Sequence, residues 1–505
     1  MRPLVCLCLT GSTIQEDLEI AEKYKSYIDV VELRADFLHE DERLNIRDFP
    51  SLVKIPCILT IRRVIDGGRY GGGEAARTTL FARALSFVDH DSAKNFAYVD
   101  FEEDFNVQSL VDAAMAFGIK IIRSVHDMKK PVKNIGERLA KLRKTGYEIP
   151  KIAFMPHSLQ DVTDFYEEAS KLNTNNQILC AMGTFGFSTR VLAERFHSYL
   201  TYTSPKELIG NLAEIGHIDP VTLATLYHFR MLDHDTCLFG ITGYPLTATS
   251  SPTLHNGKYP ESGMNAVYIP FRAETATDAF RFANVMGVRG FSVTIPHKEA
   301  IIDFLTGVDK KVRDIGACNT VVRSGDDWIG YNTDSTGIER ALLEFVGADS
   351  LKGMRVSIIG AGGAAKAVVH SVKSLGAKGC VFNRTALRAR KLAELHDFEY
   401  GGLDTEAIPK LKKYSDIIIQ TTSKGMGSRA APDETNDPIW FYDFTGKEMV
   451  YDIVYEPEVT PIMVRASVAG CKVRNGLSML KYQGEEQFRL FKEAYDKMGG
   501  GKTAW

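Results

Sequence analysis

Short apolar runs alternate with amphipathic stretches along the first 200 residues of the chain. Each run is long enough for a buried strand and too short for a helix. The stretches between them, such as 134–144 and 162–172, repeat their apolar residues at helical spacing. Strands that alternate with helices predict parallel βα units. Seven strands are expected at 3–9, 28–33, 55–61, 96–101, 119–125, 150–155 and 177–182, with an eighth near 196–203.

Eight such units within about 210 residues predict a small (β/α)8 barrel. An open doubly wound sheet is the competing layout, and the spacing of the runs does not exclude it. The alternation stops at 204–236, where a loop followed by a helix is expected, and then returns. We therefore predict an α/β chain with a barrel at 1–205, a linker at 206–236, a two-lobed unit with lobes at 237–345 and 346–475, and a C-terminal helical segment at 476–505 that packs back on the first lobe.

Composition narrows the class of protein. The 505 residues are 44% hydrophobic and 25% charged, which excludes collagen, a long coiled coil and a mostly disordered chain. Lys and Arg number 61 against 64 Asp and Glu, and the formal net charge of −3 gives no reason to expect nucleic acid or a membrane as a partner. No apolar run is long enough to span a bilayer, and the one at the start is short for a signal peptide. We expect a cytoplasmic protein, or a plastid stroma protein if the chain is a mature plant form.

The eight cysteines do not form a metal or disulfide pattern. There is no Cys-x-x-Cys pair and no Cys/His cluster with zinc spacing. Most of the cysteines lie in apolar runs, so we expect reduced core residues and no metal.

A glycine-rich turn directly follows the predicted strand 354–359 and opens a predicted helix. Its pattern is Gly-x-Gly-x-x-Ala. The first glycine permits a tight turn, the second lets the backbone approach a pyrophosphate, and the alanine permits close helix–strand packing. The helix N-terminus offers free N–H groups to phosphate oxygens. The pattern predicts a dinucleotide site formed by Gly360, Gly362, Gly363, Ala364 and Ala365.

The end of the next predicted strand bears on which dinucleotide binds. It reads Asn383, Arg384, Thr385, with Arg388 four positions after Arg384. A site that prefers NAD places Asp or Glu here, on the ribose 2′-hydroxyl. Two guanidinium groups without a carboxylate suit a 2′-phosphate, so NADP is favoured. The alternative is a glycine-rich turn with incidental surface arginines.

Polar residues end several predicted strands between 237 and 340. Thr294 and Lys298 follow one strand, and Asn319 and Asp334 lie in the two segments after it. Loops at the carboxyl ends of strands are where such folds bind ligands. Taken alone, each residue has a simpler interpretation: Lys298 as a solvated lysine, Asn319 as a turn residue and Asp334 as a helix cap.

Together these residues resemble the shikimate dehydrogenase family, across about 237–495. The resemblance implies that Lys298 and Asp334 form the catalytic pair of a ketone reduction, in which the lysine gives or relays a proton to the carbonyl oxygen. It also implies substrate ligands at Thr249, Ser251, Thr294, Asn319, Tyr455 and Gln483, and cofactor-side residues at Thr422, Ser423, Met426 and Gly476. The family usually shows Ser-x-Ser-Pro, whereas this chain has Thr249, which is compatible with shikimate or with a shift toward quinate.

Charged residues also end strands of the predicted barrel. Glu32 and Arg34 fall on the same side of one strand because side chains alternate, and His126 ends the fifth. Lys151 adjoins the sixth. If Lys151 points among the packed layers of the barrel, desolvation favours its neutral, nucleophilic amine. A lysine at the solvated bottom rim is the alternative.

This second set resembles type I 3-dehydroquinate dehydratase, across about 1–205. The resemblance implies that Lys151 forms an imine with the substrate ketone and that His126 transfers protons, without a metal. It also implies substrate ligands at Glu32, Arg34, Arg62, Asp66 and Arg190, with Asp66 in place of the family's Glu. The family's closing loop reads Ser-Ala-Pro-Gly-Gln. Its best counterpart here, 213–217, lacks the Ser and the Gln and ends in His217.

The two resemblances together imply a bifunctional enzyme of the shikimate pathway. It would dehydrate 3-dehydroquinate to 3-dehydroshikimate and then reduce this product to shikimate with NADPH. We expect small-molecule substrates, no nucleic acid or membrane partner, and a monomer or homodimer. The alternatives are a quinate/shikimate dehydrogenase with a weak or vestigial dehydratase barrel, and a non-catalytic metabolite-sensing homologue.

Overall fold

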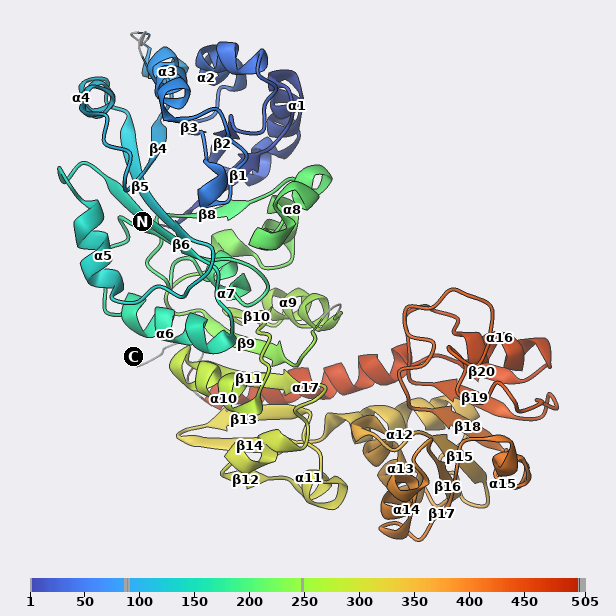
Figure 1. Cartoon of the computed structure of the whole chain (residues 1–505). Helices are drawn as coiled ribbons and strands as arrows, with labels where there is room; N and C mark the ends of the chain where they lie inside the picture. Colours follow the sequence, from blue (N-terminus) through green and yellow to red (C-terminus); the bar gives the residue numbers. More distant parts are fainter. Residues whose placement is uncertain (1, 86–88, 90, 247–248, 498, 500–505) are drawn as a thin grey trace. The chain divides into compact units, whose positions relative to one another are not determined.

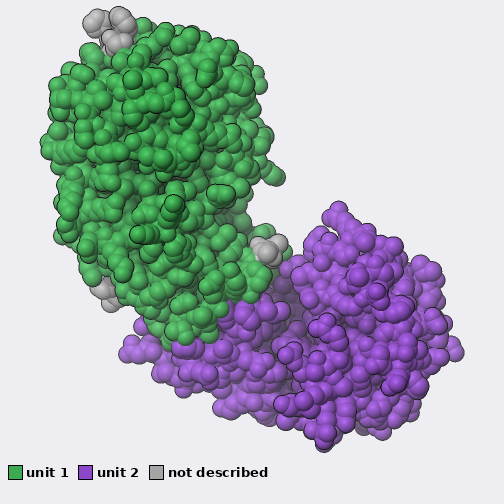
Figure 2. Space-filling model, viewed as in Figure 1, with its two compact units in different colours: residues 1–288, 500–505 green, residues 289–499 purple. Residues whose placement is uncertain are grey.

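The computed structural model of the chain describes residues 2–85, 89, 91–246, 249–497 and 499 (Figure 1). The chain divides into two compact units (Figure 2). Unit 1 comprises residues 1–288 and 500–505, and unit 2 comprises residues 289–499. No helix among the described residues is long and apolar enough to cross a membrane.

Unit 1 begins with eight parallel strands in the order β7-β6-β5-β4-β3-β2-β1-β8. The two ends of this order meet, because Tyr199 N donates a hydrogen bond to Gln177 O, so the sheet nearly closes into a barrel. This confirms the predicted barrel and excludes the open doubly wound sheet. The strands are β1 (Leu4–Leu9), β2 (Val30–Arg34), β3 (Cys57–Thr60), β4 (Tyr98–Glu102), β5 (Lys120–Asp127), β6 (Ile149–Phe154), β7 (Ile178–Ala181) and β8 (Leu200–Thr203).

Helices connect consecutive strands of the barrel (Figure 1). Helix α6 shows why they form where they do. Ser158 and Asp161 make a reciprocal capping box at its start, and its apolar residues recur at helical spacing and are buried. The helices are α1 (Ile14–Tyr24), α2 (Phe49–Val53), α3 (Glu74–Leu85), α4 (Gln108–Ala116), α5 (Ile135–Leu142), α6 (Leu159–Ala169) and α7 (Phe187–Val191), with short 3-10 helices η1 (Lys25–Tyr27), η2 (Glu42–Asp48), η3 (Val64–Asp66) and η4 (Ser92–Lys94).

The inside of the barrel changes from apolar to polar along the strands. One position on each strand contributes to an apolar cluster: Cys6, Val30, Ile58, Tyr98, Ile122, Ile149, Ile178 and Leu200. Because side chains alternate, the residue two positions later lies on the same side of the strand. These later residues are all buried and are mostly polar: Cys8, Glu32, Thr60, Asp100, Ser124, Lys151, Cys180 and Tyr202.

The chain after β8 does not leave the barrel at once. It forms the 3-10 helix η5 (Lys206–Ile215), and Ile218 then pairs with Thr203 in an isolated parallel bridge. Helices α8 (Pro220–Thr225) and η6 (Phe229–Met231) follow. Unit 1 ends with β9 (Cys237–Thr242), α9 (Ser251–Glu261), β10 (Ala266–Pro270) and α10 (Ala276–Val285), in which β9 and β10 pair in parallel.

Unit 2 contains two groups of strands. In the first, β13 (Thr320–Ser324) pairs antiparallel with both β11 (Val288–Val293) and β14 (Asp327–Tyr331). Strand β12 (Gly307–Val308) pairs in parallel with β14. The helices of this part are η7 (Ala300–Phe304), α11 (Lys310–Ile315) and α12 (Thr333–Val346).

The second group is a six-stranded parallel sheet in the order β17-β16-β15-β18-β19-β20. Numbered along the chain this order is 3-2-1-4-5-6, the arrangement of dinucleotide-binding Rossmann sheets, as the glycine-rich turn predicts. The elements are β15 (Arg355–Ile359), α13 (Gly363–Ser374), β16 (Lys378–Phe382), α14 (Ala386–Glu394), β17 (Glu399–Gly401), η8 (Thr405–Ala407), α15 (Ile408–Lys413), β18 (Ile417–Gln420), β19 (Met449–Asp452), α16 (Pro461–Val468) and β20 (Lys472–Arg474).

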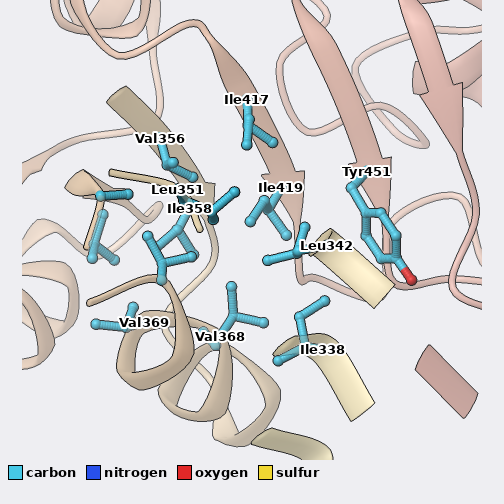
Figure 3. Packing of buried hydrophobic residues seen from close by; sticks show 14 of the residues in the cluster. Ile338, Leu342, Leu351, Val356, Ile358, Val368, Val369, Ile417, Ile419 and Tyr451 are labelled. Atoms are coloured by element: carbon cyan, nitrogen blue, oxygen red, sulfur yellow. The ribbon is translucent and has the colours of Figure 1, made fainter. Parts of the chain in front are cut away.

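One apolar core joins this sheet to the helices that flank it. Figure 3 shows side chains of β15 and β18 meeting those of α12 and α13, among them Val356, Ile358, Ile417, Ile419, Ile338, Leu342, Val368 and Val369. The long helix α17 (Leu477–Lys497) crosses α12 closely, because a Cβ atom at Gly337 would lie only 2.8 Å from Met479 O. Further along, its Phe491 lies against Gly290 of β11. The domain bounds given from the sequence stay a prediction, since the compact units divide between residues 288 and 289.

Candidate active sites

A cavity opens at the carboxyl ends of the barrel strands. Its volume is about 490 Å³, including the solvent at its mouth. Its lining includes every residue that the barrel resemblance implies: Glu32, Arg34, Arg62, Asp66, His126, Lys151 and Arg190. The other lining residues are Gly67, Met128, Ala153, Cys180, Met182, Tyr202, Ile215 and His217.

Lys151 lies inside the barrel and not at a solvated rim. It is the third residue of β6 and is 5% exposed. Its Nζ lies 3.1 Å from Oδ2 of Asp100 and 4.4 Å from the ring centre of Tyr202. The amine is therefore held in the middle of the polar layer, where a ligand in the cavity can meet it.

Asp100 is a site residue that the sequence reasoning missed. Its Oδ2 also accepts from Arg62, with Nη2 at 2.8 Å, and its Oδ1 accepts from Ser124 Oγ at 2.5 Å. Burial alone would raise the pKa of this carboxyl, but the charges of Arg62 and Lys151 outweigh burial and hold the pKa well below its ordinary value. The signal was present in the sequence, because Asp100 stands at a period of two from Tyr98 and Glu102 in an apolar strand.

Other carboxylates hold the arginines of the cavity in place. Arg34 makes two hydrogen bonds to Asp36, at 3.0 and 2.8 Å. Arg62 also reaches Glu102, with Nη1 2.6 Å from Oε1, and this carboxylate binds Arg77 of α3 as well. Fixed guanidinium groups of this kind present their remaining N–H groups in a defined direction.

Two acidic side chains at the cavity have partners of their own. Glu32 accepts hydrogen bonds from Thr60 Oγ1 at 2.7 Å and from Cys8 Sγ at 3.0 Å. Asp66, in η3, accepts from Arg63 Nε at 2.6 Å. The cavity thus carries both signs of charge, with each acidic group oriented by a neighbour.

His126 on β5 is a neutral imidazole. Burial and the positive charges of Arg62 and Lys151 lower the pKa of His126 well below its ordinary value. Its Nδ1 is buried and has no hydrogen-bond partner among the described residues. A neutral imidazole with a free nitrogen beside a lysine can take up and return a proton.

Arg190 on α7 is the cation of the cavity that lacks a counter-ion. It is 2% exposed, and no carboxylate in the described part of the chain lies within ion-pair distance of it. Nη2 contacts Ile215 O at 3.4 Å, while Nε is buried without a partner. A buried guanidinium in this state is suited to an anionic ligand, above all a carboxylate.

A second cluster forms in unit 2 around Lys298, in the turn after β11. Its Nζ lies 2.6 Å from Oδ2 of Asp334, in the first turn of α12. Asn319 Nδ2 donates to Oδ1 of Asp334 at 2.8 Å and also lies 3.1 Å from Oε1 of Gln483 on α17. The structure therefore brings together four of the residues that the dehydrogenase resemblance implies.

The remaining substrate residues of that resemblance are placed separately. Thr294 and Tyr455 are half-buried in the loops after β11 and β19. Thr249 and Ser251 belong to unit 1, where Thr249 Oγ1 lies 3.1 Å from Ser251 Oγ and accepts from Ser251 N at 3.2 Å. Two hydroxyl groups are thus held together at the start of α9.

The glycine-rich turn has the geometry that a dinucleotide needs. Gly360 has φ +118°, and a Cβ atom there would lie 2.5 Å from Thr421 Oγ1, so only glycine fits. A Cβ at Gly362, which precedes α13, would meet nothing within 4 Å, so the backbone is open to a ligand. At Gly363 it would lie 3.6 Å from Cδ of Lys298, which places the turn beside the second cluster. Ala365 is fully buried, and Ala364 is half-buried beside it.

Two further loops end at this edge of the sheet. The loop after β18 carries Thr422, Ser423 and Met426, of which Met426 is 64% exposed. Before α17, Gly476 N donates to Val454 O at 3.1 Å, and any side chain at this position would overlap Ile453 O. Both β15 and β18 flank the point where the strand order reverses, which is where such sheets bind ligands.

The turn after β16 carries the two arginines singled out from the sequence. Asn383 Nδ2 donates to Thr385 O at 3.1 Å, which shapes the turn. Arg384 and Arg388 are exposed, and neither guanidinium pairs with a carboxylate in the part of the chain that the structure describes. Both cations are therefore available to an anionic group of a ligand.

Comparisons with known proteins agree with this arrangement. Residues 5–233 match the family model of type I 3-dehydroquinase, residues 241–321 that of the shikimate dehydrogenase substrate binding domain, and residues 343–426 that of shikimate / quinate 5-dehydrogenase. The chloroplastic bifunctional 3-dehydroquinate dehydratase/shikimate dehydrogenase of Arabidopsis thaliana is 29% identical over 513 residues, which cover 97% of this chain and 82% of the relative.

Of two further similar proteins, one matches about half of this chain and the other matches nearly all of it. The shikimate dehydrogenase (NADP(+)) of Shouchella clausii is 39% identical over 253 residues, 49% of this chain and 89% of the relative. A solved structure of dehydroquinate dehydratase and shikimate dehydrogenase from S. pombe AroM is 23% identical and covers 98% of both chains, with a TM-score of 0.42. The chain belongs to the shikimate dehydrogenase family through its C-terminal half, and its residues 5–233 match the type I 3-dehydroquinase model.

Proposed function

We propose that this chain is a bifunctional enzyme of the shikimate pathway. Its first half dehydrates 3-dehydroquinate to 3-dehydroshikimate, and its second half reduces that product to shikimate with NADPH. The observation that carries the proposal is the barrel cavity, which holds Lys151, His126 and the unpaired Arg190 together. The names of the relatives, which join the same two activities, support it.

In the barrel, the amine of Lys151 attacks the ketone carbon of the substrate, and loss of one water gives an imine. The protonated imine draws electrons and acidifies the neighbouring C–H bond. His126 takes that proton as a neutral base and then returns a proton to the leaving hydroxyl group, which departs as water. Hydrolysis of the imine releases the product and frees Lys151, so one water is lost overall.

The other cavity residues bind and orient the substrate. Arg190 pairs with its carboxylate, because this guanidinium has no carboxylate partner among the described residues of the chain. Asp100 stays ionised between Arg62 and Lys151 and compensates the positive charge of the protonated imine. Glu32, Arg34 and Asp66 contact the hydroxyl groups.

In the second half, the glycine-rich turn would hold NADPH, which would supply the hydride for the ketone. Gly360, Gly362 and the N-terminus of α13 would hold the pyrophosphate of the cofactor, and Arg384 with Arg388 would meet the 2′-phosphate that distinguishes NADP from NAD. The cofactor-side set also includes Gly363, Ala364, Ala365, Asn383, Thr385, Thr422, Ser423, Met426 and Gly476.

Lys298 handles the proton of this reduction. It gives or relays a proton to the carbonyl oxygen and stabilises the developing alkoxide. Asp334, at 2.6 Å, holds the ammonium group, and Asn319 holds the carboxylate in turn. The resemblance also assigns substrate contacts to Thr294, Tyr455 and Gln483 of unit 2 and to Thr249 and Ser251 of unit 1.

Borohydride trapping tests the first half. The full chain is incubated with 3-dehydroquinate, reduced with borohydride, digested and mapped by peptide mass spectrometry. We expect one stable adduct, on Lys151, and none without substrate. An adduct on another lysine, or none at all, contradicts the imine assignment. To test both reactions in sequence, the chain is mixed with NADPH, and 3-dehydroquinate is added as the only substrate. Oxidation of NADPH then reports dehydration followed by reduction.

The alternatives are not favoured. A vestigial barrel or a metabolite sensor would be free to lose catalytic groups, yet Lys151, His126, Lys298 and Asp334 are all present and the first two share one cavity. More efficient turnover of quinate than of shikimate would contradict the proposal for the second half. We further propose a monomer or homodimer that acts in the cytoplasm, or in the plastid stroma for a mature plant form.

A further inference from the structure

The segment that follows β8 is built into the mouth of the barrel. Backbone hydrogen bonds join Gly183 N to Ile215 O at 2.9 Å and Ser204 N to Ile218 O at 3.1 Å. Asn211 Nδ2 donates at 3.1 Å to Thr10 O, in the loop after β1, the strand that pairs with β8. The segment 206–218 is thus fixed to the loops after β1, β7 and β8 and closes part of the cavity.

A glycine directs the next residue of this segment into the cavity. Gly216 has φ +68°, and a Cβ atom there would lie 2.6 Å from Gly183 O. No other residue fits this approach without displacing the β7–α7 loop. His217 follows directly and lines the cavity together with Lys151, His126 and Arg190.

Two neighbours fix the imidazole of His217. Its Nδ1 lies 2.7 Å from Ser204 Oγ. Its ring is parallel to that of Tyr202, with planes 6° apart and centres 6.4 Å apart, an offset stack. With Nδ1 occupied by Ser204, Nε2 is left, and this atom has no hydrogen-bond partner among the described residues.

The charges around His217 keep its ring neutral. Burial and the cations Arg190, Arg34 and Lys151 lower the pKa of His217 well below its ordinary value. A neutral imidazole has one N–H donor and one acceptor nitrogen. Such a group among three cations suits a neutral hydroxyl, whereas the carboxylate of a ligand is better bound by Arg190.

We propose that His217 is a specificity-determining residue of the barrel site, whose Nε2 makes a hydrogen bond to a hydroxyl group of a polyhydroxylated cyclic carboxylate. Ser204 and Tyr202 set the direction of the ring. The inference rests on the proposed dehydratase function. It adds that the imidazole of His217 recognises a hydroxyl group of the substrate. The proposed steps at the ketone and at the C–H bond are assigned to Lys151 and His126, so we expect His217 to act on binding and not on the chemical steps.

Steady-state kinetics of dehydration with the full chain test this role. His217→Phe keeps the stack on Tyr202 and removes both ring nitrogens. We expect its KM for 3-dehydroquinate to rise about tenfold, with kcat changed less than about threefold, since one net hydrogen bond is lost. His217→Gln keeps a donor and an acceptor and should restore most of the affinity. Ser204→Ala releases the ring and should raise KM about threefold.

A matched control and two readouts separate the outcomes. His234→Phe makes the same change at a side chain of the same connecting region that is 77% exposed and outside the cavity, and should leave dehydration unchanged. An unchanged KM in His217→Phe, or a fall in kcat alone, overturns the inference. If His217→Phe does not fold by circular dichroism, the decision falls to His217→Gln and Ser204→Ala, where an unchanged KM in both overturns it. Wild-type chain that does not turn over 3-dehydroquinate instead contradicts the proposed function.

Discussion

The lysines of the two proposed sites, Lys151 and Lys298, both lie against a buried carboxylate, but the two carboxylates differ in what else they bind. Asp100 divides one oxygen between Lys151 at 3.1 Å and Arg62 at 2.8 Å. Asp334 gives one oxygen to Lys298 at 2.6 Å and the other to the neutral amide of Asn319. One carboxylate therefore serves two cations, and the other serves one.

This difference matches the two tasks. Asp100 stays bound to Arg62 when Lys151 becomes part of the imine, so the carboxylate keeps its place beside the new positive charge. Asp334 binds Lys298 and Asn319, which fixes the lysine for proton transfer to the carbonyl oxygen. A lysine–carboxylate pair is thus proposed for nucleophilic catalysis in one site and for acid catalysis in the other, and the second partner of the carboxylate, Arg62 or Asn319, distinguishes the two.

Replacing Lys151 or Lys298 with alanine should have the largest effect on the two activities and tests whether each lysine serves only its own site. Lys151→Ala removes the nucleophile, so dehydration should fall by at least about 10⁴-fold while shikimate oxidation stays within twofold of wild type. Lys298→Ala should instead lower shikimate oxidation and leave dehydration within twofold of wild type. Separate assays of the two reactions on each variant measure both rates. Dehydration near the wild-type rate in Lys151→Ala would refute the imine assignment.

Asp100→Asn and Asp334→Asn test the carboxylates. In Asp100→Asn, two buried cations lose a shared counter-charge, so we expect the free energy of unfolding of unit 1 to fall by about 3–5 kcal/mol and kcat for dehydration by about 100-fold. In Asp334→Asn the loss of stability should be smaller, below about 2 kcal/mol, because only Lys298 is left and its side chain is 15% exposed. Denaturant unfolding and kcat are measured for both variants. Equal losses of stability would show that the contact of Asp100 with two cations, Lys151 and Arg62, does not matter for stability.

The barrel site was largely accessible from the sequence because strands fix directions. A period of two puts Glu32 and Arg34 on one side of their strand, and the carboxyl ends of parallel strands meet at one edge. Whether Lys151 points into the barrel or lies at its rim stayed open, and the resemblance supplied its role. Asp100 follows the same rule and was missed only because the predicted strand at 96–101 was read as apolar. Periodicity could not place His217, because η5, which precedes it, is a 3-10 helix with a non-helical residue at Leu212. Only the resemblance indicated His217, as the end of the closing-loop counterpart.

The second cluster shows what local patterns leave out. Asn319 and Gln483 are 164 positions apart and meet because α17 crosses α12 at Gly337. A helix crossing depends on which surfaces pack, and periodicity reports only that each helix has an apolar face. The resemblance to a family supplied these residues, whereas the pattern alone left Asn319 as a turn residue.

Each unit also buries a carboxyl group whose pKa is raised to near neutral. Burial raises the pKa of Asp17 in unit 1 and that of Asp452 in unit 2 from 3.8 to about 7. The folded chain then keeps these protons up to about pH 7, while the unfolded chain releases them near pH 4. The free energy of unfolding should therefore fall as pH rises between these values, by up to about 4 kcal/mol for each carboxyl.

Asparagine at each position should remove its share of this slope, measured by denaturant unfolding at about pH 4 and about pH 7. We expect the larger effect for Asp17→Asn, because Oδ2 of Asp17 has no hydrogen-bond partner among the described residues, whereas Oδ2 of Asp452 accepts from Thr460 at 2.6 Å. An unchanged slope in Asp17→Asn would show that this carboxyl is ionised in the folded chain.

The two halves also differ in the arginines that we propose for anionic groups of their ligands, Arg190 for the substrate carboxylate and Arg384 for the cofactor 2′-phosphate. Arg190 is buried in the barrel cavity, whereas Arg384 is exposed at the end of β16. Water screens an exposed charge, so removing Arg384 should cost less than removing a buried cation. We expect Arg384→Ala to raise KM for NADP about tenfold and KM for NAD less than about twofold, because only NADP carries the 2′-phosphate.

Arg390→Ala is the matched control for this smallest effect. Arg390 lies on the same helix, α14, but its guanidinium already pairs with Glu394 at 2.7 Å and is not available to a phosphate. Its removal should leave KM for both cofactors unchanged. Steady-state kinetics of shikimate oxidation with each cofactor measure the ratio directly. If Arg384→Ala weakens NADP and NAD equally, the arginine supports the turn and does not read the 2′-phosphate, and the preference for NADP must then come from Arg388 or from the turn around Asn383.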